Sequence, residues 1–227
     1  MYRLYIGNKN YSSWSLRPWV LMRELQIPFT EQLLRFGDEA DWRPFRQLCP
    51  SGKVPCLQDG EIQVWESLAI VEYLAERHQR VWPADSRERA WARSAASEMH
   101  AGFSELRARC SMSCGVRLRL AAIPPALERD LARIAALWNE GLQRFGGPFL
   151  AGRTFSAVDA FYAPVAFRVQ TYGLVLPGAA ASYALHLLDV GSMREWYQQA
   201  LAEPFRDTPH ESEILAAGRL LQDLRSA

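Results

Sequence analysis

Residues 52–67 read GKVPCLQDGEIQVWES, and this stretch decides how the first part of the chain folds. Pro55 stands at the head of a short apolar run, and because proline cannot donate to a β-ladder, it belongs at a strand start or edge. An Asp59-Gly60 pair between two apolar runs is a strong hairpin signal. The stretch therefore predicts two short antiparallel strands joined by a tight turn.

The same stretch leads directly into an amphipathic helix. Ser67 is a favourable N-cap, and apolar residues follow it at helical spacing at positions 68, 70, 71 and 74. The free N–H groups of a helix N-terminus attract a carboxylate. A cis bond between Val54 and Pro55 would also leave the backbone groups of Val54 free for a ligand. We therefore expect a ligand site at this corner of the fold.

Outward from this stretch, strand and helix patterns alternate over residues 1–79. Besides the hairpin, the patterns predict strands at 2–7 and 29–35 and helices at 14–25, 41–48 and 67–78. The order β-α-β-α-β-β-α implies a small mixed sheet with helices on its faces. We therefore predict an α/β domain over residues 1–79.

Residues 80–86 read as a linker, because a proline there stops the preceding helix and Asp85 can cap the next one. Helix patterns then occupy 87–114, 126–145, 183–201 and 211–224, and a further helix begins with a capping box at Ser156 and Asp159. No convincing strand pattern follows the linker. We therefore predict an all-α helical bundle domain over residues 87–227.

The composition argues against several classes of function. The chain is 49% hydrophobic and 22% charged with a formal net charge of +1, which is typical of a soluble globular protein. This balance gives no basis for a nucleic-acid partner, and no apolar run could span a membrane. The N-terminus reads as a strand rather than a signal peptide, so we expect a cytoplasmic location.

The four cysteines have no metal-binding spacing, and no histidine pair accompanies them. They are Cys49, Cys56, Cys110 and Cys114. In a protein without a secretory signal, we expect them to be reduced and mostly buried. No metal cofactor is therefore expected.

Three serines cluster where the helix after the first strand begins, namely Ser12, Ser13 and Ser15. Ligands of α/β sheets gather at the carboxyl ends of strands, and this loop lies at such an end. One serine can simply cap the helix. Alternatively, a hydroxyl donates a hydrogen bond to a bound thiolate and lowers its pKa from the usual value of about 8.5. Such a thiol would be nucleophilic at neutral pH.

Together these motifs resemble the glutathione transferase superfamily over essentially the whole chain. The resemblance is carried by Ser12-Ser13-Trp14-Ser15-Leu16-Arg17, Lys53-Val54-Pro55, Glu66-Ser67, and Phe149-Leu150-Ala151-Gly152 followed by Ser156-Ala157-Val158-Asp159. It implies that the first domain is thioredoxin-like and that the second is the helical domain of the family. The Ser-Ser-x-Ser segment is most similar to the serine-type zeta class.

The resemblance implies that glutathione is a co-substrate and assigns residues to it. Val54, before a cis Pro55, would exchange backbone hydrogen bonds with the cysteinyl part. Glu66 would pair with the γ-glutamyl ammonium and Ser67 with its carboxylate. Lys53 would lie near the glycyl end. The resemblance also implies a homodimer.

Ser12 aligns with the activating serine of the family when counted back from Arg17, and Ser13 is the next candidate. The hydroxyl would stabilise the glutathione thiolate for attack on a small electrophile between the domains. The expected walls of this second site are Tyr11, Trp14, Met99 and Phe103. Met99 and Phe103 would share one helix face with Leu106, which is better explained as core.

Trp14 departs from the zeta class, which carries a cysteine at this position, and this weakens the case for isomerisation of maleylacetoacetate. Arg107 or Arg117 could bind a substrate carboxylate, although solvation explains each more simply. The first prediction is a glutathione transferase. The alternatives are a glutathione-fold binding or scaffold protein with little turnover, and a zeta-like glutathione-dependent cis–trans isomerase.

Overall fold

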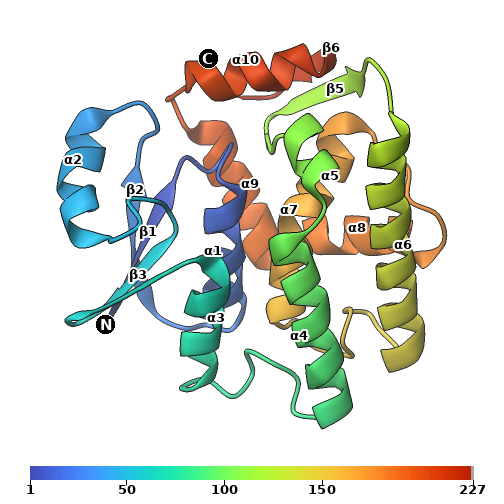
Figure 1. Cartoon of the computed structure of the whole chain (residues 1–227), viewed down its shortest axis with the longest axis horizontal. Helices are drawn as coiled ribbons and strands as arrows, with labels where there is room; N and C mark the ends of the chain where they lie inside the picture. Colours follow the sequence, from blue (N-terminus) through green and yellow to red (C-terminus); the bar gives the residue numbers. More distant parts are fainter. Residues whose placement is uncertain (226–227) are drawn as a thin grey trace.

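An α/β unit and a mainly helical unit lie side by side in the computed structural model, which describes residues 1–225 (Figure 1). The first unit contains a sheet of strand order β2-β1-β3-β4. Its strands are β1 (Tyr2–Gly7), β2 (Phe29–Leu34), β3 (Cys56–Asp59) and β4 (Ile62–Trp65). β1 is parallel to β2 and antiparallel to β3, and β3 is antiparallel to β4. The predicted mixed sheet is confirmed.

Helices cover both faces of this sheet. They are α1 (Ser13–Glu24), α2 (Glu39–Leu48) and α3 (Ser67–Ala75). Figure 1 shows α2 on one face and α1 and α3 on the other, toward the helical unit. Side chains alternate along β1, so Leu4 and Ile6 join the main core while Tyr5 packs against Phe45 of α2. The face that carries α1 is therefore buried against the rest of the molecule.

The stretch 52–67 forms the predicted strand–turn–strand. Leu57 pairs with Val64 across the hairpin, and Gly60 at its turn has a φ of 60°, a left-handed conformation that glycine adopts readily. The Val54–Pro55 peptide is cis. The prediction that Ser67 is the N-cap was wrong, because Glu66 occupies that position with a φ of 68° and Ser67 is the first helical residue.

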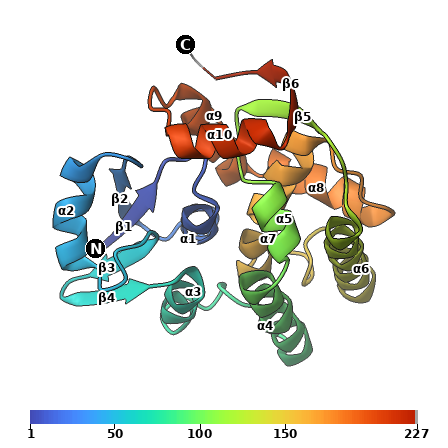
Figure 2. The same cartoon turned by 45° about the horizontal axis from the view of Figure 1, so that its top comes forward.

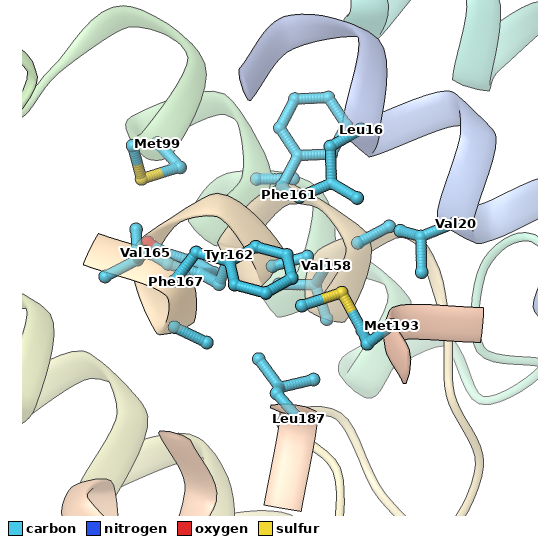
Figure 3. Packing of buried hydrophobic residues seen from close by; sticks show 14 of the residues in the cluster. Leu16, Val20, Met99, Val158, Phe161, Tyr162, Val165, Phe167, Leu187 and Met193 are labelled. Atoms are coloured by element: carbon cyan, nitrogen blue, oxygen red, sulfur yellow. The ribbon is translucent and has the colours of Figure 1, made fainter. Parts of the chain in front are cut away.

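The helical unit is built around α7, which is buried on nearly every side. Its helices are α4 (Ser86–Ala101), α5 (Ser104–Arg109), α6 (Pro125–Phe145), α7 (Ala157–Tyr172), α8 (Ala179–Asp189), α9 (Gly191–Ala202) and α10 (Thr208–Ala216). Phe161 of α7 lies near Leu16 of α1, while Leu187 of α8 and Met193 of α9 close the other side (Figure 3). α7 therefore joins the two units through a continuous apolar core.

The long helix predicted over 87–114 is interrupted. α4 ends at Ala101, and the next residue is Gly102, where a Cβ would lie 2.8 Å from the carbonyl oxygen of Glu98. Phe103 then takes a left-handed backbone conformation, with φ 56° and ψ 45°, before α5 begins. Phe103 is therefore not part of α4, and it does not continue the helix face of Met99 as the sequence pattern predicted.

The helical unit also contains a small sheet that the sequence patterns did not predict. β5 (Val116–Leu120) and β6 (Gly218–Asp223) pair antiparallel. β6 replaces the second half of the helix predicted over 211–224, and α10 crosses the molecule just before it (Figure 2). The alternating VRLRL sequence of β5 is a period-two signal, but it is too short to stand out between two helices.

The linker predicted at 80–86 and the domain boundaries beside it stay predictions, although α3 ends at Ala75 and α4 begins at Ser86. Among residues 1–225, the structure contains no helix that is long and apolar enough to cross a membrane.

Candidate functional site

A pocket of about 350 Å³ lies between the two units at the N-terminal end of α1. The α/β unit contributes Tyr11, Ser12, Ser13, Trp14, Phe36, Trp42, Lys53 and Val54 to its lining. The helical unit contributes Arg107, Ser111, Met112, Arg168, His210 and Glu213. Both units are therefore needed to form it.

A second, smaller pocket of about 180 Å³ adjoins the first. Its lining consists of Trp14, Ser51, Lys53, Val54, Pro55 and Glu66. The two pockets share Trp14, Lys53 and Val54, so they are neighbouring parts of one cleft. The cleft joins the serine cluster to the cis-proline corner and the start of α3.

Three residues predicted for the site lie outside the lining of both pockets. Met99 is fully buried in the main core (Figure 3), and Phe103 is 7% exposed and packs in the same core. Ser67 is fully buried, and its Oγ accepts a hydrogen bond from Nη1 of Arg17 at 3.4 Å. The remaining predicted residues line the cleft, namely Tyr11, Ser12, Ser13, Trp14, Lys53, Val54, Pro55 and Glu66.

The Ser12 hydroxyl is held by another hydroxyl rather than by the helix. Ser12 occupies the N-cap position of α1, yet its side chain makes no capping bond. Its Oγ donates to Oγ of Ser15 at 2.7 Å, and the same oxygen of Ser15 accepts the N–H of Gly7 at 3.2 Å. Ser15 therefore orients the Ser12 hydroxyl, and Ser12 lines the pocket.

Ser13, the first residue of α1, also lines the pocket and is half-buried. Its backbone N–H donates to the carbonyl of Tyr11 at 2.9 Å. The helix N-terminus beneath both serines favours negative charge. Either hydroxyl could therefore approach a bound anion.

Stacked aromatic rings form part of the lining of the larger pocket. His210 of α10 stacks on Tyr11 with ring centroids 5.1 Å apart and on Phe36 at 4.9 Å. Phe36 in turn stacks on Trp42 at 5.7 Å. The hydroxyl of Tyr11 donates to Glu211 at 2.6 Å, and burial together with this carboxylate raises the pKa of Tyr11. Tyr11 therefore stays protonated at neutral pH.

Sequence patterns missed His210 because it lies far from Tyr11 along the chain and belongs to a helix whose extent was misjudged. Nδ1 of His210 lies 2.5 Å from Oδ2 of Asp207, but this contact joins residues only three positions apart and gives no information on the tertiary position of His210. A Pro-His-Glu sequence alone does not indicate which surface the helix covers.

Three arginines lie in or beside the pocket. Arg17 and Arg107 contact the Trp14 ring, and Arg107 and Arg168 line the pocket from the helical unit. The Arg17 guanidinium lies 4.1 Å from the Trp14 ring centroid, and that of Arg107 lies 5.1 Å from it. Burial lowers the pKa of Arg17 to about 9 and that of Arg168 to about 10, and neighbouring positive charge contributes in both cases. Arg168 is not among the residues that the sequence motifs predicted for the site.

All four cysteines are buried, as expected. Burial raises the pKa of the Cys56 thiol, and the neighbouring Cys49 adds to the effect. A raised thiol pKa makes a cysteine less reactive at neutral pH. Within the described residues, no cluster of His, Cys, Asp or Glu side chains is placed to hold a metal ion.

Comparisons with known proteins find relatives of this chain. The family model for the glutathione S-transferase N-terminal domain matches residues 11–77. Glutathione S-transferase GstB from Escherichia coli strain K12 is 30% identical over 221 residues, which cover 88% of this chain and 93% of that protein.

Solved structures share the fold. A glutathione transferase homolog from Burkholderia gl BGR1 with bound glutathione has a TM-score of 0.65 at 20% identity, covering 88% of this chain and 97% of that one. Glutathione S-transferase unclassified 2 from Bombyx mori has a TM-score of 0.70 at 18% identity, covering 96% and 99%. With the nearly full-length match to GstB, these findings show that the chain belongs to the glutathione S-transferase family.

Proposed function

We propose that the protein is a glutathione transferase in which a serine hydroxyl stabilises the glutathione thiolate for attack on a small electrophile. The main support is the continuity of the cleft: Ser12 and Ser13 line the larger pocket, Glu66 lines the smaller one, and Val54 lines both. A tripeptide in the smaller pocket would place its sulfur toward the serines. The larger pocket is then free for the electrophile.

The start of α3 supports the placement of the γ-glutamyl end. Glu66 is an exposed, non-glycine residue with a φ of 68° and ψ of 128°, and such backbone conformations cost roughly 1–3 kcal/mol and cluster at functional sites. The first N–H groups of a helix have no intrahelical partner and favour an anion. We propose that the Glu66 carboxylate binds the γ-glutamyl ammonium, while Ser67 binds the carboxylate through its N–H.

The paired hydroxyls of Ser12 and Ser15 support thiolate stabilisation. A hydroxyl proton can rotate to suit its partner. If Ser15 donates to Ser12, the Ser12 proton becomes free to donate to sulfur. Ser15 would then act as a positioning residue, and the Gly7 N–H would still be bonded to it. Ser13 is the second candidate for the donor.

Retention on immobilised glutathione, followed by conjugation of chlorodinitrobenzene, tests this function. We expect retention, elution by free glutathione, and turnover above the uncatalysed rate. Retention without turnover of any electrophile would favour the glutathione-binding alternative, and failure to bind would contradict the proposal. From the family resemblance we also expect a homodimer, and from the N-terminal sequence pattern a cytoplasmic location.

Replacement of Glu66 by glutamine should weaken glutathione binding about tenfold, which corresponds to about 1.4 kcal/mol. The change removes the charge that pairs with the ammonium but keeps the size of the side chain. The matched ligand is glutaryl-cysteinyl-glycine, which lacks the amino group. Calorimetry should show that Glu66→Gln leaves the affinity for this analogue unchanged. Equal weakening of both ligands would contradict the assigned pairing.

A further inference from the structure

We infer that the second substrate carries an anionic group, a carboxylate or a similarly planar oxyanion, and that Arg107 and Arg168 bind it. This inference rests on the proposed function for the role of the larger pocket. Arg107 comes from α5 and Arg168 from α7, and both line that pocket. Neither belongs to the part of the cleft proposed for the γ-glutamyl end.

Arg168 has hydrogen-bonding capacity left over. The residue is 3% exposed, and its Nε donates to the carbonyl of Cys110 at 2.7 Å. Its Nη1 is buried without a hydrogen-bond partner in the part of the chain that the structure describes. A buried charged donor without a partner is costly unless a ligand supplies the acceptor. The Cys110 bond holds the guanidinium in place beside the pocket.

Arg107 is half-buried and is also fixed by one backbone bond. Its Nη1 donates to the carbonyl of His100 at 3.1 Å, and its guanidinium lies beside the Trp14 ring. Arg17, 1% exposed on the α/β side of the same ring, adds a third positive charge nearby. The three charges repel one another, which contributes to the lowered pKa of Arg17.

This positive charge has no carboxylate to balance it at close range. Among residues 1–225, none of the three guanidinium groups is within ion-pair distance of an aspartate or glutamate. Glu213 lines the pocket but is exposed. A planar oxyanion would supply two acceptors to the guanidinium forks and neutralise part of the charge.

The aromatic wall completes the description of the ligand. Tyr11, Trp14 and Phe36 line the same pocket as the two arginines, and Trp14 lies beside the Arg107 guanidinium. Aromatic rings favour stacking with a flat apolar body. The pocket therefore suits a small aromatic or unsaturated acid, whose apolar part faces the rings and whose anionic end faces α5 and α7.

Direct binding tests the site without turnover. The probes are nitrobenzoate and nitrobenzamide, which share a shape but differ in charge. We expect calorimetry to show that the wild type binds the anion at least about tenfold more tightly. Arg107→Gln and Arg168→Lys should each reduce this ratio to within about threefold of unity, since lysine keeps the charge of Arg168 but not its planar fork.

Arg109→Gln is the matched control. Arg109 lies two residues after Arg107 on α5, is exposed, and pairs with Glu105 at 2.8 Å. The substitution removes the same charge from the same helix without touching the pocket, so the wild-type ratio should persist. Circular dichroism and thermal melting establish that each variant is folded.

Kinetics provide the second readout, with chloronitrobenzoate and its methyl ester as electrophiles. The glutathione sulfur forms a bond to the ring carbon, chloride leaves with the electron pair of the C–Cl bond, and the thiol proton passes to solvent. Each kcat/KM is divided by the uncatalysed rate constant with glutathione. We expect the arginine variants to lose the wild-type preference for the acid while retaining turnover of the ester.

Two results would overturn the inference. One is equal affinity of the wild type for nitrobenzoate and nitrobenzamide. The other is an anion preference that survives both arginine substitutions. If glutathione binding is weakened in these variants while the preference survives, the arginines bind glutathione itself. If neither electrophile is turned over, the binding ratio alone decides the anion site, and the conjugation of chlorodinitrobenzene separately decides the proposed transferase function.

Discussion

Ser12→Ala should reduce conjugation at pH 6.5 by about 50-fold while leaving the affinity for glutathione near that of the wild type. The expected cause is loss of the hydrogen bond that stabilises the thiolate. If this bond lowers the thiol pKa by about two pH units, it contributes about 2.7 kcal/mol to the ionised form. The affinity is maintained mainly by the γ-glutamyl end, some distance from the sulfur.

The pH profile distinguishes this role from a general loss of structure. In the wild type, kcat should fall as the pH drops through the lowered pKa of bound glutathione. In Ser12→Ala the same limb should move upward by about two pH units, toward the pKa of a free thiol near 8.5. The two enzymes should therefore approach one another in rate above about pH 9. A loss of equal size at every pH would contradict thiolate stabilisation.

Ser13→Ala is the internal control because Ser13 lines the same pocket one residue away. We expect its profile to overlay that of the wild type. A shifted profile in Ser13→Ala with an unchanged one in Ser12→Ala would assign the donor to Ser13 instead. Ser15→Ala should produce a partial shift, because it removes the hydroxyl that orients Ser12.

The parts of the cleft that the sequence predicted well are those fixed by local chemistry. The Asp59-Gly60 turn sets the pairing of its flanking strands, and the proline at position 55 marks where the first of them starts. The serines lie at a strand end that the alternation of patterns already defined. Such features depend only on residues that are neighbours in the sequence, so they can be predicted without knowledge of the tertiary fold.

The helical side of the cleft was harder to predict because it depends on where helices end. The sequence pattern was interpreted as one continuous helix through Gly102, although glycine often marks a helix end. A continuous helix would place Met99 and Phe103 on the same face. In the structure both belong to the core. His210 lines the pocket from α10, which begins at Thr208, before the start of the predicted helix, and gives way to β6 after Ala216.

Arg168 did carry a signal in the sequence. It lies in a helix whose other positions are almost all apolar, and such a helix is expected to be buried on every side. Arginine is rarely buried unless it is paired, so an arginine in this setting needs a partner or a ligand. Because Arg168 lines the cleft, a ligand is the better explanation of its burial. The sequence does not show that α7 borders the cleft at this point; only the folded structure does.

Asp159 connects three parts of the helical unit and is fully buried at the start of α7. Its Oδ1 accepts the N–H of Leu150 at 3.0 Å and the hydroxyl of Tyr183 at 2.7 Å. Its Oδ2 accepts the N–H of Ser156 at 2.9 Å and the hydroxyl of the same residue at 3.3 Å. The capping box predicted from the sequence is confirmed, and Leu150 and Tyr183 extend it.

Asp159→Ala should therefore lower the free energy of unfolding by about 3–5 kcal/mol, measured by urea denaturation. Capping alone would contribute only roughly 0.5–2 kcal/mol. The larger value is expected because the N–H of Leu150 and the hydroxyl of Tyr183 would also lose their acceptor inside the core. Ser156→Ala, which removes one of the four donors, should cost about 1 kcal/mol. If Asp159→Ala were no more destabilising than Ser156→Ala, the carboxylate would act only as a cap, and the connection from α7 to α8 would contribute nothing to stability.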